Sequence, residues 1–141
     1  MPTAFESATL NLRLYELRRE PVLREARAWF LAEFHPQTFE DAVAIVRGPR
    51  NPWFRMVTGY WDMAASLVTS GAIDAGSFLA AHGESIGAFS LVEPFLAQLR
   101  AMRNAPDYLW HIEQVVTGMP DAAAQIAGRR ERLRAMAAPR A

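Results

Sequence analysis

The chain has 141 residues, about half of them hydrophobic, with no cysteine and with fifteen basic residues balancing fifteen acidic ones. This composition excludes a disordered chain, a disulfide framework and a thiolate zinc site, and the balanced charge gives no long-range attraction for nucleic acid or an anionic membrane. No apolar stretch is long enough to span a bilayer and the first twenty residues lack a signal-peptide pattern, so we expect a cytoplasmic protein with no membrane partner.

Apolar spacing and capping residues predict three helices in the first third of the chain, over about 4–19, 21–34 and 38–47. Thr3 and Thr38 each precede an acidic residue at capping-box spacing, and Pro21 suits a first helical turn. In the first helix one set of apolar residues recurs at intervals of three and four, and we expect it to face the core. The set is Phe5, Ala8, Leu12 and Tyr15, and Leu10, Leu14 and Leu17 widen the same apolar side.

Four further helical segments follow, over about 51–70, 74–83, 85–103 and 106–119, and an Ala/Arg-rich C-terminal helix covers about 120–141. Pro94 falls inside the third of these and must kink or break it, because proline cannot donate the hydrogen bond to the Ser90 carbonyl. No alternating strand pattern occurs. We therefore predict an all-α fold, a single domain over 1–141 with about six to seven helices in a bundle-like or orthogonal arrangement, its last helix loosely packed.

The central stretch resembles a bacterial helical family catalogued as domain of unknown function 4760, over about residues 55–106. The residues that carry the resemblance are Arg55, Tyr60, Leu67, Gly71, Ile73, Asp74, Phe78, Gly83, Ile86, Pro94, Leu99, Arg100 and Pro106. The resemblance implies a helical fold and supplies no activity. Members often look as if they carry a membrane helix ahead of this region, a feature that this sequence lacks.

Two histidines invite a chemical interpretation. Asp107 and His111 are four residues apart on the helix predicted from Pro106, so both could face one metal ion, although a surface hydrogen bond explains the spacing equally well. His82 lies at a helix end, where a partly protonated imidazole interacts favourably with the helix dipole, and we expect it to cap that helix. We expect no metal and no cofactor, because no complete ligand or cofactor motif is present.

Glu93 and His111 are the candidate catalytic residues. Glu93 could act as a general acid or base, because its helix places it among apolar residues and burial would raise its pKa unless Arg100 or Arg55 pairs with it. Structural pairing is the simpler interpretation. Four aromatic residues could line a ligand pocket between the 53–70 and 86–103 helices, or could simply be core. They are Trp53, Tyr60, Trp61 and Trp110.

The C-terminal helix carries a cluster of basic residues, Arg129, Arg130, Arg132 and Arg134. We expect a solvated or self-association surface rather than nucleic-acid binding, because the chain is neutral overall and no aromatic residue is interleaved with the cluster. The leading hypothesis is a non-enzymatic interaction domain that forms a homo-oligomer, first of all a dimer, through the first two helices or the last. The alternatives are an enzyme or small-ligand binder, and weak nucleic-acid binding.

Overall fold

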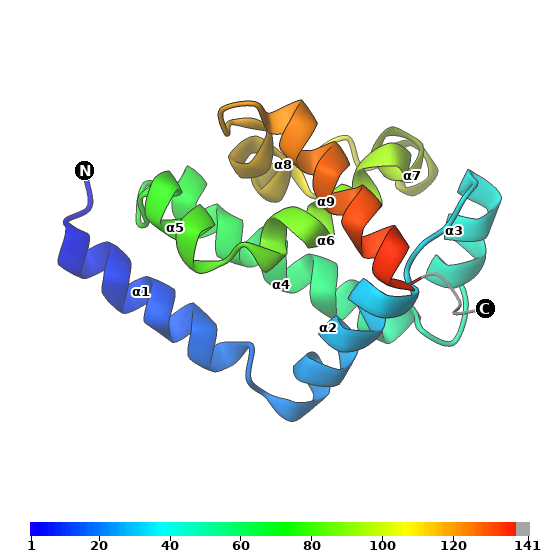
Figure 1. Cartoon of the computed structure of the whole chain (residues 1–141), viewed down its shortest axis with the longest axis horizontal. Helices are drawn as coiled ribbons and strands as arrows, with labels where there is room; N and C mark the ends of the chain where they lie inside the picture. Colours follow the sequence, from blue (N-terminus) through cyan, green and yellow to red (C-terminus); the bar gives the residue numbers. More distant parts are fainter. Residues whose placement is uncertain (138–141) are drawn as a thin grey trace.

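The computed structural model describes residues 1–137, and over that range the chain forms nine α-helices, one short 3₁₀ helix and no strand (Figure 1). The helices are α1 (Ala4–Leu17), α2 (Pro21–Glu33), α3 (Phe39–Val46), α4 (Asn51–Thr69), α5 (Ala75–Ala81), α6 (Glu84–Val92), η1 (Glu93–Phe95), α7 (Leu96–Arg103), α8 (Trp110–Thr117) and α9 (Ala122–Ala137). The all-α prediction is confirmed, and the predicted number of helices is too low.

Helix α4 is the centre of the fold and packs against α2, α3, α6 and α8. Its apolar residues recur every three or four positions, so Phe54, Val57 and Trp61 all lie on one side and are almost fully buried. Phe54 extends the core toward α2: its ring centroid lies 5.2 Å from that of Phe34, which in turn stacks on Phe30 at 4.9 Å. These aromatic contacts fix α2 against α4.

Pro94 breaks the helix predicted over 85–103 instead of merely kinking it. Helix α6 ends at Val92, a single 3₁₀ turn carries the proline, and α7 begins at Leu96. The break leaves the Ser90 carbonyl without its helical donor, and the Nε of Arg130 donates to that oxygen at 2.7 Å. A side chain from the C-terminal helix thus replaces the hydrogen bond that the proline removes.

Two predicted helix starts are wrong by two to four residues. Helix α8 begins at Trp110 and not at Pro106, because Leu109 adopts a left-handed conformation with φ of 57°. Helix α9 begins at Ala122 and not at Pro120, because Asp121 also has a positive φ, of 53°. Asp107 therefore lies in a turn and not on the helix that carries His111.

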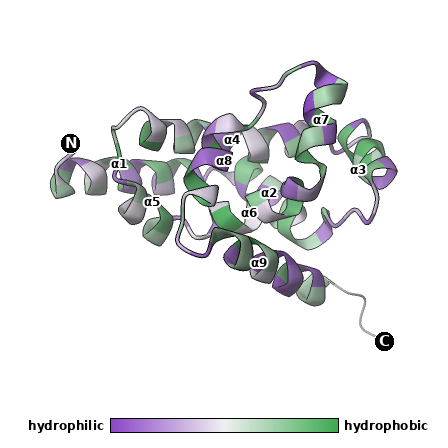
Figure 2. Ribbon diagram, turned by 90° about the horizontal axis from the view of Figure 1, so that it is seen from above, coloured by the Kyte–Doolittle hydropathy of each residue, from purple (hydrophilic) through white to green (hydrophobic). Residues whose placement is uncertain are grey.

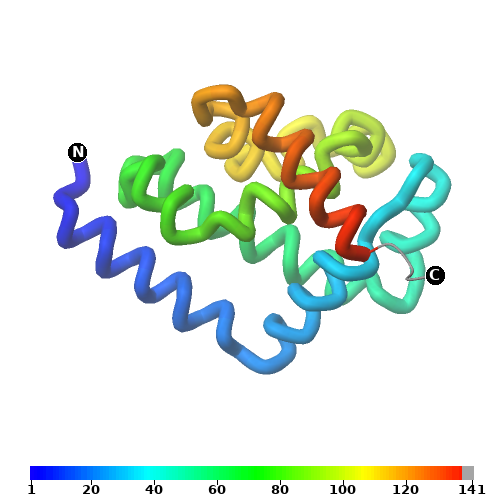
Figure 3. Tube along the Cα trace, in the orientation of Figure 1, coloured from blue at the N-terminus to red at the C-terminus, as the bar shows by residue number. Residues whose placement is uncertain are grey.

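Helix α9 packs along α6 and reaches α2, as Figure 3 shows. Ile126 is its one buried residue, and Leu133 packs against the core at the edge. Residues 138–141 of the predicted helix lie outside the described residues. At the other end of the molecule α1 lies beside α5 (Figure 2).

Candidate functional site

Helix α1 is rotated relative to the sequence-based prediction. Of the apolar residues expected on its core side, Leu14 is buried and Leu10 packs against the core, but Phe5 keeps 79% of its surface in solvent, Leu12 66% and Tyr15 48%, and Ala8 is also exposed. The buried side of α1 carries the polar residues Ser7 and Asn11 beside Leu14. We call the exposed set Phe5, Ala8, Leu12 and Tyr15 the outer stripe.

Hydrogen bonds explain why the polar side of α1 turns inward. The Oγ of Ser7 accepts from the backbone N–H of Asp74 at 3.1 Å, and the amide of Asn11 donates to the Ser77 Oγ at 3.3 Å. The Tyr60 hydroxyl donates to the Leu14 carbonyl. The same side of α1 also buries the apolar side chain of Leu14, so hydrogen bonds and apolar burial together hold this side of α1 inward.

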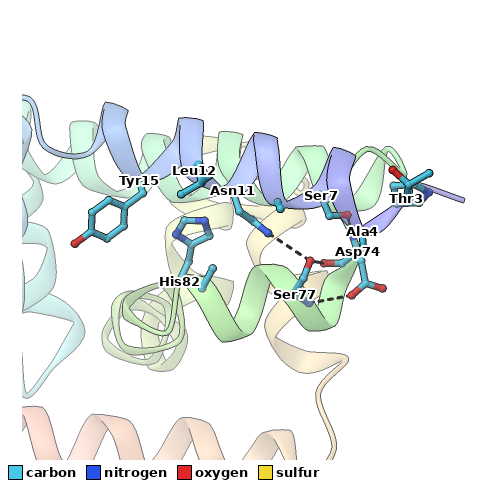
Figure 4. Close-up of a pocket in the computed structure, with 12 residues that line it drawn as sticks. Thr3, Ala4, Ser7, Asn11, Leu12, Tyr15, Asp74, Ser77 and His82 are labelled. Atoms are coloured by element: carbon cyan, nitrogen blue, oxygen red, sulfur yellow. Dashed lines mark hydrogen bonds between the residues drawn. The ribbon is translucent and has the colours of Figure 1, made fainter.

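A groove of about 680 Å³ runs between α1 and α5, and we call it the α1–α5 groove (Figure 4). Its walls are mostly apolar, and its polar groups come from the inner side of α1 and from α5. The lining residues are Pro2, Thr3, Ala4, Ser7, Ala8, Asn11, Leu12, Tyr15, Asp74, Ser77, Ala81 and His82. Cavities of this volume accommodate small molecules.

His82 lies at the floor of the groove and is 1% exposed. Its ring lies 5.1 Å from the Phe78 ring and 5.9 Å from the Trp61 ring, centroid to centroid, and neither of its nitrogens has a hydrogen-bond partner. Burial and, to a smaller extent, the nearby charge of Arg18 together lower the pKa of His82 to about 4. His82 is the C-cap residue of α5, and its backbone N–H donates to the Phe78 carbonyl, but the lowered pKa disfavours the partly protonated imidazole that the sequence predicted there.

Glu93 is not buried as the sequence suggested. Its side chain is 40% exposed, and its carboxylate pairs with Arg130 at 2.7 Å, not with Arg100 or Arg55. Arg100 pairs instead with Glu113 at 2.9 Å. The cause is the break at Pro94, which places Glu93 in a 3₁₀ turn facing α9.

Asp107 and His111 line a shallow surface depression together with Asp62. His111 accepts or donates one hydrogen bond through Nδ1, to the Thr69 hydroxyl at 2.7 Å, and Asp62 accepts from the backbone N–H of Ile112 at 3.1 Å. Within residues 1–137 no three acidic or histidine side chains gather as metal ligands do.

The aromatic candidates do not meet in one pocket. Trp61 is buried, Tyr60 and Trp53 are partly buried, and Trp110 is 43% exposed. The cavity between α4 and α6, where the sequence placed a possible ligand, has a volume of only about 10 Å³ and includes Trp61 alone of the four. That volume is about the space for one water.

The C-terminal arginines separate into two kinds. Arg129 donates to the Gly83 carbonyl at 2.9 Å and Arg130 contacts Ser90 and Glu93, so both fasten α9 to α6. Arg132 and Arg134 are exposed. Two of the four charges therefore serve the fold.

Sequence reasoning did not identify the α1–α5 groove, although one signal was present. Ser7 and Asn11 stand four residues apart and thus share a helix face, which an amphipathic surface helix would turn to solvent. The partners Asp74 and Ser77, from which the inward orientation follows, are more than sixty residues away.

A family model described as "Domain of unknown function (DUF4760)" matches residues 3–119. The comparisons with curated proteins and with solved structures returned no match. None of the helices in the described range combines the length and apolar character needed to cross a bilayer.

Proposed function

The chain belongs to the family catalogued as domain of unknown function 4760, and because that family supplies no activity, we propose from the surface of α1 that the protein is a non-enzymatic, self-associating interaction domain. In this proposal the outer stripe of α1 packs against the outer stripe of a second copy. The observation that carries the proposal is the exposure of Phe5, Leu12 and Tyr15 on one helix face.

The spacing of the outer stripe suits a helix–helix contact. Positions 5, 8, 12 and 15 alternate by three and four, which is the spacing of the a and d positions of a two-helix seam. Removing apolar surface from water is favourable by about 25 cal/mol for each Å², so covering Phe5 and Leu12 with an apolar surface of a second copy stabilises the dimer. In a two-fold symmetric dimer the outer stripe of one copy contacts the outer stripe of the other, so one surface forms both sides of the interface.

Sedimentation equilibrium of the wild type across a wide concentration range tests the proposal. We expect a concentration-dependent dimer that Phe5→Glu converts to a monomer. This variant preserves the fold, because Phe5 is exposed and a carboxylate in the first turn of α1 interacts favourably with the helix dipole.

Leu17→Glu is the matched control, since Leu17 is a 41% exposed apolar residue of α1 outside the outer stripe. We expect Leu17→Glu to dimerise like the wild type. A wild type that stays monomeric at every concentration, or a Phe5→Glu variant with the wild-type mass, contradicts self-association. In the latter case vesicle co-sedimentation decides whether the stripe contacts lipid instead.

A further inference from the structure

Unpartnered polar atoms in the described part of the chain concentrate at the α1–α5 groove. Five buried side-chain nitrogen or oxygen atoms lack a hydrogen-bond partner, and three of them belong to groove residues: Oδ1 of Asn11 and both ring nitrogens of His82. Native proteins satisfy nearly all buried polar atoms, because each one left without a partner is destabilising. Such a concentration beside a large groove makes the groove floor a candidate ligand site.

The hydrogen bonds around Asn11 fix the orientation of its amide. The Ser77 hydroxyl donates to the Asp74 carbonyl at 3.0 Å, so its oxygen must accept from Asn11, which therefore donates through Nδ2. The Asn11 carbonyl oxygen is left free as an acceptor. Asp74 is already engaged, since its carboxylate accepts from the Ser77 N–H at 2.9 Å.

His82 supplies the complementary groups. An uncharged imidazole presents one N–H donor and one bare nitrogen acceptor, and burial with the nearby Arg18 keeps the ring of His82 uncharged by lowering its pKa. Figure 4 shows the His82 ring directed from the end of α5 toward α1, beside Asn11. The groove floor thus offers two acceptors and one donor and no charge of its own.

We propose that the α1–α5 groove binds a small, mostly apolar alcohol or phenol whose hydroxyl exchanges hydrogen bonds with Asn11 Oδ1 and His82. The apolar body then lies between Ala8 and Leu12 of α1 and Ala81 of α5. A hydroxyl matches the floor because it donates one bond and accepts another. A charged counterpart loses its hydration in a mostly apolar groove without gaining an ion pair from Asn11 or the uncharged His82, so it binds more weakly.

Calorimetric titration of the full chain with 4-propylphenol tests the site, with propylbenzene and 4-propylbenzoate as matched probes. We expect 4-propylphenol to bind about tenfold more tightly than propylbenzene, the ratio that one satisfied hydrogen bond gives. We expect 4-propylbenzoate to bind no better than propylbenzene. Equal affinity for propylbenzene and 4-propylphenol, or no binding of 4-propylphenol, overturns the proposal.

Variants separate the polar floor from the apolar walls. His82→Phe keeps an aromatic ring and removes both nitrogens, so it should reduce the preference for the phenol over propylbenzene to what the hydrogen bond to Asn11 Oδ1 alone provides. Ala81→Leu fills the groove from an exposed position, which spares the fold, and should weaken both probes. Wild-type binding of the phenol by Ala81→Leu overturns the site even where His82→Phe fails to fold.

Ala8, Leu12 and Tyr15 of the outer stripe also line the groove, so the ligand and a second copy of the chain compete for these side chains, and one further variant separates the two proposals. Phe5 does not line the groove, so Phe5→Glu should bind 4-propylphenol at least as tightly as the wild type while losing self-association. Wild-type binding in a monomeric Phe5→Glu supports the ligand site alone. Loss of binding together with loss of the dimer means that the dimer builds the site, and the single-chain proposal is then wrong.

Discussion

Arg130 donates through Nε to the carbonyl oxygen of Ser90 at 2.7 Å, and that oxygen is the one that Pro94 leaves without a helical donor. The same guanidinium reaches the Glu93 carboxylate through a second nitrogen at 2.7 Å. One side chain from α9 therefore supplies the hydrogen-bond donor that is missing at the break between α6 and α7, and it attaches the C-terminal helix to this break. The arrangement makes the break and the docking of α9 energetically dependent on one another.

The first prediction follows from that dependence. Arg130→Met should lower the free energy of unfolding by about 2 kcal/mol, because a buried carbonyl loses a charged donor. Adding Pro94→Ala supplies a backbone N–H to Ser90, so the double variant should lose less than the sum of the single variants. Urea denaturation of the four proteins measures the coupling, and strictly additive free energies contradict it.

The second prediction concerns acid. Burial holds the pKa of His82 at about 4 in the folded chain, against 6.5 for an unperturbed histidine. As the pH falls from 6.5 to 4 the unfolded chain binds a proton that the folded chain does not, so stability is lost over this window and is unaffected above it. The loss should reach at most about 3 kcal/mol.

His82→Leu isolates that contribution, because leucine cannot titrate. The difference between the unfolding free energies of wild type and His82→Leu should be constant above pH 6.5. Between pH 6.5 and 4 the wild type should lose stability relative to His82→Leu. Two stability curves that run parallel across the window would show that His82 is not protected from water.

The third prediction concerns the ion pair between α2 and α6. Arg27 donates to both carboxylate oxygens of Glu84, at 2.6 and 2.8 Å, and the two side chains are only 16% and 20% exposed. Arg27→Met should cost about 2 kcal/mol, because it leaves Glu84 partly buried without its partner. The double variant Arg27→Met with Glu84→Leu should recover part of that stability, and thermal unfolding monitored by circular dichroism provides the measurement.

Local chemistry made many helix boundaries predictable. Thr3 and Thr38 form the capping boxes that their spacing indicates, Asp74 caps α5, and Gly71 takes the positive φ that ends a helix. Each of these features depends on residues within one turn of the chain, and for that reason the all-α fold could be predicted from the sequence.

The errors have one physical origin, which is long-range pairing. Periodicity identifies the residues that share a helix face but not which face turns inward, and in α1 that choice depends on Asp74 and Ser77 of another helix. Glu93 meets Arg130 across 37 positions of sequence. The burial of His82 likewise depends on α1 lying over it, so neither the groove nor its orphaned nitrogens could be predicted from local pattern.

The polar contacts that attach α1 also determine which part of the molecule unfolds locally. Hydrogen bonds from Ser7 and Asn11 attach α1 to α5 with little apolar burial beyond Leu14, so this helix can detach at a smaller free-energy cost than unfolding of the core requires. Detachment of α1 exposes the imidazole of His82 to water, and the ring then regains its ordinary affinity for a proton. Lifting of the N-terminal helix and proton uptake are therefore one linked equilibrium, and mild acid drives amide hydrogen exchange in α1 before it reaches α4.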